Sequence, residues 1–503
     1  MTKLNSEVSD QSAIAIVGAG IAGMACAIRL ANKGYRIHVF EANTYPGGKL
    51  TEMHTEGYRF DAGPSLFTMP HLVDELFRLS GENPSDYFQY QRLPITCRYF
   101  YEDGTVITGY AEKEKFAEEV AHKTNVDKNT VLAALQHAAF LYETLGELFM
   151  ERSLHQWQTF LNKKAVQAYT QLHKLDFFRT LHQANREQFS DPKVVQLFNR
   201  FATYNGSDPY QVPATMHIIP HLEFNIGAFL PKGGMHAITN SLFQLARRLG
   251  VTFHFNARVE KILVERKHVK GIQVSGKAYG FDKVVSNMDM VNTYKKLLSD
   301  QPQPKRLLNQ PKSSSALIFY WGVKQSFEQL DLHNIFFSKN YRAEFEHIFQ
   351  KQDIYEDPTV YINITSKYQA SDAPEGCENW FTMINVPNNS GQDWDALIDK
   401  ARGYTLRKLS RILKSDISAL IATETTLDPR MIEQKTSSAQ GALYGNSSNN
   451  RYAAFLRHAN FSSKINGLYF CGGSVHPGGG IPLCLLSAKI VADFMPEHPS
   501  EKK

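Results

Sequence analysis

The sequence predicts an α/β fold built around a dinucleotide-binding unit, and three observations support this prediction. The first is an apolar run that leads into closely spaced glycines and a helical pattern within residues 13–34. The second is a glycine-rich segment between a strand pattern and a helical pattern at 466–492. The third is composition, since 43% hydrophobic and 21% charged residues are ordinary for a globular protein. A chain of 503 residues is expected to fold as two or three units.

The N-terminal segment has the pattern of a strand, a tight turn and a helix. Residues 13–17 form a continuous apolar run, typical of a buried parallel strand, and the glycines that follow have the spacing G-x-G-x-x-G. In such a unit Gly18 makes the tight turn, Gly20 lets the backbone approach a pyrophosphate, and Gly23 lets the helix pack closely on the strand. The free amides at the helix N-terminus are then available to the anion.

A second apolar run at 35–40 ends in Glu41, about 20 residues after the first glycine, where such units carry the acid that binds the ribose hydroxyls. A carboxylate there repels a 2′-phosphate, so NADP is disfavoured, while NAD and FAD both stay open at this point. The alternative is a glycine-rich turn with no ligand. Strand, glycine spacing, helix, second strand and acid together favour a binding site.

Charge and cysteine content exclude some classes of partner and site. A formal net charge of +5 is too small for so long a chain to indicate nucleic-acid binding, and we expect no nucleic-acid partner. Five cysteines without C-x-x-C spacing are expected to be reduced, and the motifs indicate no metal site. The polar first residues lack the basic start and apolar core of a secretory signal, so we expect a cytoplasmic protein.

Two further segments, Pro-Gly-Gly-Lys at 46–49 and Phe-Asp-Ala-Gly-Pro-Ser at 60–65, carry a family resemblance. With the first glycines, they resemble the start of the bacterial phytoene-type carotenoid desaturases, relatives of amine oxidases and protoporphyrinogen oxidases. The resemblance implies a Rossmann-like domain that binds FAD, with the lysine by the phosphates and the Gly-Pro-Ser corner close to the flavin ring. The residues assigned to FAD in this way are Gly48, Lys49, Gly63, Pro64 and Ser65.

The C-terminal segment is the most specific in the chain. A strand pattern at 466–470 leads into Gly-Gly-Ser-Val-His-Pro-Gly-Gly-Gly-Ile-Pro at 472–482, and a helical pattern follows. Glycines let the main chain touch a flat ligand, and the N-terminus of that helix stabilises negative charge, as on a reduced flavin. The segment closely resembles the signature of bacterial carotenoid desaturases, and His476 in it is expected to shape the turn rather than exchange protons. It adds to the predicted FAD site Gly473, Ser474, Gly480, Ile481 and Pro482.

The middle of the chain is predicted to leave the cofactor domain and return to it. Phe-Leu-Pro-Lys-Gly-Gly-Met at 229–235 resembles the family turn that leads back, and 256–262 resembles the segment whose backbone, near Val259, meets the adenine. We expect an FAD-binding domain of the amine oxidase and phytoene desaturase superfamily with an inserted α+β substrate domain and a helical part that faces the membrane. The FAD-binding domain is expected to comprise 1–86, 225–300 and 430–503, and the substrate-binding domain 87–224 and 301–429.

Residues 150–201 interleave aromatic and basic side chains, as does an amphipathic helix that lies in the lipid headgroup layer. The aromatic residues are Trp157, Phe160, Tyr169, Phe177, Phe178, Phe189, Phe198 and Phe201, and the basic ones are Lys163, Lys164, Lys174, Arg179, Arg186 and Arg200. A solvated helical hairpin with its own core is the alternative. Because the implied substrate is lipophilic, we expect this segment to bind a membrane surface, which makes the protein a peripheral membrane protein.

The resemblance at both ends implies an FAD-dependent enzyme that introduces C=C bonds into a carotenoid during carotenoid biosynthesis. The sequence is nearer to the 1-hydroxycarotenoid 3,4-desaturases than to enzymes that begin from phytoene. The alternatives are a phytoene desaturase, a flavin-dependent carotenoid isomerase or saturase, and a carotenoid-carrying flavoprotein without activity. Such chemistry needs an apolar tunnel and positioning more than a strong base, so no catalytic residue is predicted. The electron acceptor is expected to be a quinone or oxygen.

Overall fold

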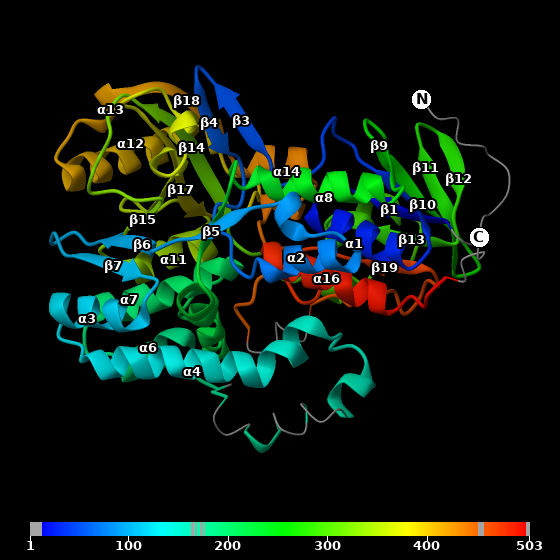
Figure 1. Cartoon of the computed structure of the whole chain (residues 1–503), viewed down its shortest axis with the longest axis horizontal. Helices are drawn as coiled ribbons and strands as arrows, with labels where there is room; N and C mark the ends of the chain where they lie inside the picture. The colour runs from blue at the N-terminus through cyan, green and yellow to red at the C-terminus, as the bar shows by residue number, and fades with distance from the viewer. Residues whose placement is uncertain are drawn as a thin grey trace.

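The computed structural model describes residues 13–161, 165, 169–171, 175–176, 178–450 and 457–498 of the chain. Figure 1 shows two halves, each built on a sheet, that lie side by side, with a group of helices below one of them. The half at the right of Figure 1 contains the first and the last elements of the described residues, a strand at Ala13–Val17 and a helix at Ile481–Asp493. The chain therefore passes out of this half and comes back to it.

A five-stranded sheet forms the centre of the half at the right of Figure 1. Its order is β19-β13-β1-β2-β9, and its pairings are parallel. The strands are β1 (Ala13–Val17), β2 (Arg36–Phe40), β9 (Thr252–His254), β13 (Lys283–Ser286) and β19 (Leu468–Phe470). Because β2 and β13 lie on opposite sides of β1, the chain order reverses there, and the carboxyl end of β1 is the expected ligand-binding crevice.

Both faces of β1 are covered, which explains why its sequence is apolar throughout rather than alternating. Ile14 and Ile16 face a helical layer, whereas Ala13, Ala15 and Val17 face an antiparallel three-stranded sheet. That small sheet consists of β10 (Val259–Glu265), β11 (His268–Val274) and β12 (Lys277–Gly280).

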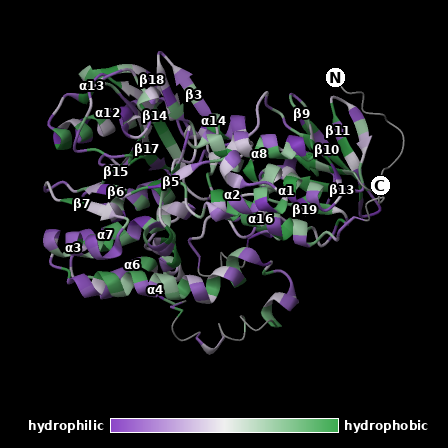
Figure 2. Cartoon of the chain, viewed as in Figure 1, coloured by the Kyte–Doolittle hydropathy of each residue, from purple (hydrophilic) through white to green (hydrophobic). Residues whose placement is uncertain are grey.

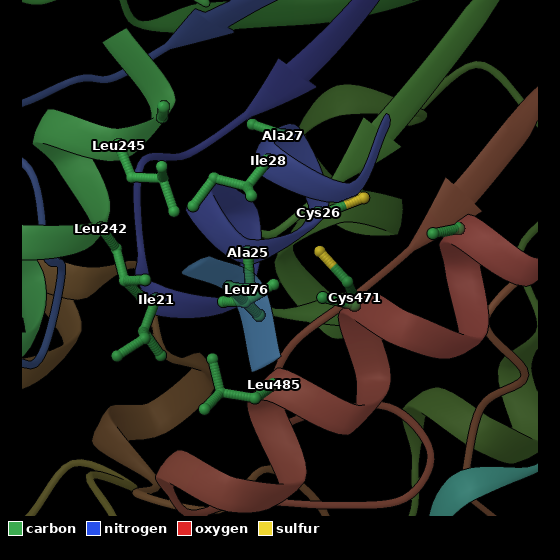
Figure 3. Packing of buried hydrophobic residues seen from close by; sticks show 14 of the residues in the cluster. Ile21, Ala25, Cys26, Ala27, Ile28, Leu76, Leu242, Leu245, Cys471 and Leu485 are labelled. Carbon is green, nitrogen blue, oxygen red and sulfur yellow. The ribbon is translucent and has the colours of Figure 1, made fainter. Parts of the chain in front are cut away.

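The helical layer consists of α1 (Ile21–Asn32), α2 (His71–Leu79), α8 (His236–Arg248) and α16 (Ile481–Asp493). The first ten residues of α1 are all buried, since the other three helices pack around it. Figure 3 shows the side chains that meet in this layer: Ile21, Ala25, Leu76, Leu242, Leu245 and Leu485. The first and last helices of the described residues thus share one core, and each begins at the crevice beside β1.

A seven-stranded sheet, in the order β18-β14-β17-β16-β15-β6-β7, forms the other half. Its strands are β6 (Ile95–Phe100), β7 (Val106–Tyr110), β14 (Ser315–Val323), β15 (His333–Phe336), β16 (Val360–Ile364), β17 (Glu378–Val386) and β18 (Ile421–Leu427). In β14, Leu317, Phe319 and Trp321 pack under α12 (Trp394–Leu413), while Ala316, Ile318 and Tyr320 lie on the opposite face. The second face meets Tyr58 and Phe60 and is not covered by α12.

The strands of the two sheets come from the segments that the sequence assigns to two domains. One N-terminal hairpin, β3 (Glu52–Thr55) and β4 (Tyr58–Asp61), nevertheless packs against β17 of the seven-stranded sheet. There Arg59 lies 2.7 Å from Asp61 in the same strand and 3.2 Å from Asp372, so the second of these buried ion pairs joins the two halves. The exact domain boundaries stay a prediction.

The helices below the seven-stranded sheet include α3 (Lys113–Lys123), α4 (Lys128–Gly146), α6 (Leu181–Gln188) and α7 (Pro192–Asn199). Hydrophobic and hydrophilic residues alternate along α4 in Figure 2, as expected for a helix with one buried face. The prediction that Phe189, Phe198 and Phe201 face lipid is wrong, because all three are buried against Phe116 and Phe224. Helical spacing alone does not show which element covers a face.

The segment after α4 is different, because it holds most of the large exposed hydrophobic residues in the described part of the chain. These are Trp157, Leu161, Tyr169 and Phe178. Lys163, Lys164, Lys174 and Phe177 lie outside the described residues. Among the residues that the structure describes, no helix has the length and hydrophobicity required to cross a membrane.

The helical layer provides a test of the packing. We expect Leu245→Ala to lower the free energy of unfolding by about 2–5 kcal/mol, because Leu245 is 0% exposed and its loss leaves a cavity between α1 and α8. The control is Leu79→Ala at the end of α2, where the side chain is 48% exposed and the expected change is within about 0.5 kcal/mol. Urea unfolding of both variants at equal FAD content measures the difference. Equal losses would contradict the packing described here.

Candidate active site

A cavity of about 1240 Å³ lies between the carboxyl end of β1 and the inner face of the seven-stranded sheet, which is the face that carries Ala316, Ile318 and Tyr320. Ordinary small-molecule pockets have about 300–1,000 Å³, so this one has room for more than one ligand. Gly18 and Glu41 line it on one side, and Ile318, Phe381 and Met383 line it on the other. A polar region and an apolar region thus meet in one space.

The glycine loop after β1 has no room for side chains. Gly18 has φ +97°, and a Cβ on Gly20 would lie 2.7 Å from Oδ1 of Asn287. A Cβ on Gly23 would overlap the carbonyl oxygen of Gly18. Gly18 and Gly20 line the cavity, whereas Gly23 lies behind them where α1 crosses β1. Gly18 and Gly20 therefore leave their backbone at the cavity, and Gly23 lets α1 pack on β1, while the approach of a pyrophosphate stays a prediction.

Glu41 follows β2 directly and lies at the same end of the sheet as the glycine loop. Its Oε2 accepts the backbone N–H of Ala19 at 2.8 Å, and its Oε1 accepts that of Asn43 at 2.8 Å. Each carboxylate oxygen keeps a lone pair for a further donor. The side chain is thus fixed in place with acceptor capacity left for two ribose hydroxyls.

Lys49 is the one predicted phosphate ligand with a formal charge. Its Nζ donates a hydrogen bond of 2.8 Å to the carbonyl oxygen of Leu443, and the residue lines the cavity beside Gly48. Burial lowers the pKa of Lys49, and the neighbouring Asp289 opposes this effect. A desolvated cation next to a cavity is stabilised by a bound anion, which fits a diphosphate.

The Gly-Pro-Ser corner lies at the junction between the two halves. A Cβ on Gly63 would overlap the carbonyl oxygen of Lys49, so the two loops can cross only with glycine here. Pro64 and Ser65 line the cavity, and Oγ of Ser65 lies 2.7 Å from the hydroxyl oxygen of Tyr361 on β16. The N-terminal segment therefore contacts the seven-stranded sheet inside the cavity.

The C-terminal segment closes the same cavity. Gly480, Ile481 and Pro482 place the N-terminus of α16 on its wall, next to Gly473 and Ser474. Gly480 has φ +98° and caps a helix of 13 residues, whose unpaired amides favour negative charge at this point.

His476 does not line the cavity. It is buried, and its Nε2–H donates to the carbonyl oxygen of Arg152 at 2.8 Å. Burial lowers the pKa of His476 to about 4, so the ring stays neutral near pH 7. These contacts agree with the expectation that this histidine shapes the turn.

The structure brings the sequence-predicted site residues together from five separate segments. Val259, at the start of β10, is buried and lines the cavity with the others. Of the residues predicted to bind the cofactor, Gly23 alone does not line the cavity. Their assignment to particular atoms of a ligand stays a prediction.

Sequence reasoning missed several residues that shape the site. Asn287 follows β13, donates from Nδ2 to the carbonyl oxygen of Cys471 at 3.1 Å, and lies across the glycine loop. Its position directly after a strand beside β1 is a signal that could have identified it. Tyr361 and His333, on β16 and β15, carry no motif, and their place in the cavity follows from the sheet order alone.

The part of the cavity in the second half is largely apolar. Its apolar wall consists of Leu66, Ala316, Ile318, Ile335, Phe381, Met383, Leu427 and Leu443. A buried ion pair also lines this part of the cavity, since Arg200 is 3.0 Å from Glu223, and Tyr204 also bonds to this carboxylate. Arg200 therefore lies inside the protein, and the prediction that it faces anionic lipid is wrong.

Residues 21–495 match the family model described as flavin containing amine oxidoreductase. The chain belongs to this family. It is 52% identical over 481 residues to a 1-hydroxycarotenoid 3,4-desaturase from Flavobacterium sp. (strain P99-3), with 96% of this chain and 98% of that protein covered. It is 33% identical to a 4,4'-diapolycopene oxygenase from Methylomonas sp, with 96% and 98% covered. Among solved structures, an oxidoreductase from Methanosarcina mazei has a TM-score of 0.64 at 15% identity, with 96% and 100% covered.

The cofactor of this flavin containing amine oxidoreductase is FAD, and the residues present fit it. The glycine loop and the N-terminus of α1 offer free amides to a diphosphate, and Glu41 offers acceptors to a ribose. The N-terminus of α16 offers a partial positive charge to a flavin ring.

The glycine loop provides a test of this fit. We expect Gly23→Ala to weaken FAD binding roughly tenfold or more, because overpacking of about 1–3 kcal/mol would displace α1 from Gly18 and shift the amides. Flavin absorbance relative to protein absorbance, after dialysis, measures the loss. The control is Gly280→Ala, where the nearest atom to a new Cβ is the carbonyl oxygen of Lys270 at 4.0 Å. Full FAD retention by Gly23→Ala would contradict the role of this glycine.

Proposed function

We propose that the protein is an FAD-dependent carotenoid desaturase that introduces the 3,4 double bond of a 1-hydroxycarotenoid. The observation that carries this proposal is the 52% identity across 96% of the chain to a relative of that name. The apolar wall supports it, because a hydrocarbon chain needs a water-free path that reaches the cofactor. Bound FAD supplies the two-electron oxidant for such a reaction.

The two sides of the cavity have separate tasks in this proposal. Gly18, Gly20 and Lys49 bind the diphosphate, Glu41 binds the ribose, and the backbone near Val259 meets the adenine. The residues proposed to surround the flavin end are Gly48, Gly63, Pro64, Ser65, Gly473, Ser474, Gly480, Ile481 and Pro482. Gly23 supports the loop from behind.

The inner face of the seven-stranded sheet is proposed to hold the polyene. Ile318, Phe381 and Met383 offer a continuous apolar surface from neighbouring strands β14 and β17. Such a surface excludes water and fixes the position of the polyene. This is the main requirement when the substrate has no group for a strong base to attack. The proposed roles of these residues are binding and orientation.

An anaerobic turnover tests the function. Purified protein with bound FAD is mixed with liposomes that carry a 1-hydroxycarotenoid, and flavin absorbance is followed together with the mass of the pigment. We expect the flavin to bleach and the pigment to become two hydrogens lighter, since the oxidant is the bound cofactor. The control is the same protein with liposomes that carry no pigment, in which the flavin is expected to stay oxidised.

The other outcomes separate the alternatives. A changed pigment geometry with unbleached flavin would indicate an isomerase, and unchanged pigment would indicate a carrier. Product that forms only with oxygen and gains an oxygen atom would indicate an activity like that named for the Methylomonas relative. A phytoene desaturase would convert phytoene and leave the hydroxylated carotene unchanged. Each of these results would contradict the proposed 3,4-desaturation.

We also propose that the protein takes its substrate from a membrane surface through the segment after α4. Trp157 is 68% exposed and Phe178 is 83% exposed, and this segment lies at the lower edge of Figure 1, beyond both sheets. Large exposed aromatic side chains in one segment are typical of a surface that inserts into the headgroup layer. A quinone in that membrane, or oxygen, is the proposed electron acceptor.

Vesicle binding tests this surface. We expect the double variant Trp157→Ser and Phe178→Ser to bind vesicles of phosphatidylglycerol at least about tenfold more weakly, because two apolar side chains no longer leave water. The matched control is Leu79→Ser, an exposed apolar residue on α2 outside this segment. Co-sedimentation at fixed salt measures the partition. Equal binding by the double variant and the wild type would contradict the proposal.

A further inference from the structure

A hydrogen-bonded chain of three polar side chains lies on the wall of the apolar part of the cavity. Oγ of Ser65 lies 2.7 Å from the hydroxyl oxygen of Tyr361, and this oxygen lies 2.7 Å from Nδ1 of His333. All three residues line the cavity. Ser65 comes from the Gly-Pro-Ser corner, whereas the other two come from the seven-stranded sheet. The hydrogen-bonded chain therefore connects the two halves of the protein.

The protonation of His333 follows from its surroundings. The residue is 3% exposed, and burial lowers its pKa to about 4, so the ring is neutral near pH 7 and carries one N–H. The amide Nδ2 of Asn363, which can only donate, lies 3.3 Å from Nδ1. Nδ1 is therefore an acceptor, and the proton of the ring is on Nε2.

The remaining bonds of the chain follow from this assignment. Burial raises the pKa of Tyr361, so its O–H is intact and donates to Nδ1 of His333. The hydroxyl of Ser65 then donates to the oxygen of Tyr361. Every polar group of the hydrogen-bonded chain then has a partner, except Nε2–H of His333.

Nε2 of His333 is buried, and among the described residues it has no hydrogen-bond partner. The neighbouring ion pair does not supply one, because both carboxylate oxygens of Glu223 already accept from Arg200, Tyr99 or Tyr204. Buried N–H groups without a partner are rare, since each loses its bond to water on folding. Because His333 lines the cavity, this unpaired donor beside it points to an acceptor on a ligand.

We infer that Nε2–H of His333 recognises a hydroxyl group of the polyene, close to the carbons that react. This inference rests on the proposed function and adds a binding residue to it. In a 1-hydroxycarotenoid that is desaturated at C3–C4, three single bonds join the hydroxyl oxygen to C3, and such a path spans about 3.8 Å. The group that binds the hydroxyl must therefore lie beside the flavin. Ser65 holds one end of the hydrogen-bonded chain at the Gly-Pro-Ser corner, which is proposed to lie close to the flavin.

The arrangement explains why one hydroxyl group would decide which carotenoid is used. The rest of the polyene offers only hydrocarbon to the apolar wall, so all carotenes of similar length would bind there alike. A buried donor changes this, because a carotene without the hydroxyl leaves Nε2–H unpaired in the complex. Sites built to bond a substrate hydroxyl discriminate strongly against analogues that lack it.

The test compares two carotenes that differ only in the 1-hydroxyl group. For the wild type we expect a higher kcat/KM with the hydroxylated carotene. His333→Phe keeps an aromatic side chain and removes the Nε2–H donor. In this variant we expect the ratio of the two kcat/KM values to fall roughly tenfold to a hundredfold. The matched control is Ile362→Val, next to Tyr361 on β16 but on the opposite face under α12, which does not line the cavity and is expected to leave the ratio unchanged.

Tyr361→Phe is the second variant. Without the tyrosine O–H, only the longer 3.3 Å contact with Asn363 holds the ring and keeps its proton on Nε2, so we expect the ratio to fall in this variant as well. FAD content and the thermal midpoint, measured for every variant, show whether the protein folds. If His333→Phe does not fold, the ratio in Tyr361→Phe decides.

An unchanged ratio in either folded variant would overturn the inference. A wild type that desaturates both carotenes with equal kcat/KM would also overturn it, while the proposed desaturase activity would stand. A wild type that desaturates neither carotene would contradict the proposed function itself.

Discussion

The close approach of the glycine loop to α1 is the constraint on which the rest of the site depends. Gly23 lets the first turn of α1 lie against the carbonyl oxygen of Gly18, and Gly20 lets Asn287 cross the loop. With a side chain at either position the helix would move off the sheet. Because α1 is also the centre of the helical layer, the same contact positions α16 and its N-terminus at the cavity.

The second sheet gives the cavity its chemical character. In β14, alternate residues bury one face under α12 and leave the other face to line the cavity, so the apolar wall is a direct result of strand geometry. Such a wall suits a hydrocarbon and discriminates little between hydrocarbons of one size. The hydrogen-bonded chain of Ser65, Tyr361 and His333 interrupts the wall with polar groups. Polar groups in an apolar cavity are the means by which one position along a polyene can be fixed.

Local patterns predicted much of this site, and contacts between distant segments account for what they missed. The run 13–17 and the spacing of Gly18, Gly20 and Gly23 fix a strand, a turn and a helix within one short segment, and the structure has them. His333 and Tyr361 belong to strands whose neighbours are set by the order of seven strands, which no local pattern contains. Phe198 and Phe201 have the spacing of an exposed amphipathic helix, and α3 and the turn near Phe224 cover them.

The central claim is that a single cavity holds FAD at the end of the parallel sheet and the polyene along the seven-stranded sheet. A crystal structure of the protein with FAD and a 1-hydroxycarotenoid tests this claim most directly. The account predicts the diphosphate against Gly18 and Gly20, the polyene along Ile318 and Phe381, and the hydroxyl oxygen within hydrogen-bond distance of Nε2 of His333. A polyene bound outside this cavity, or FAD bound away from the glycine loop, would contradict it.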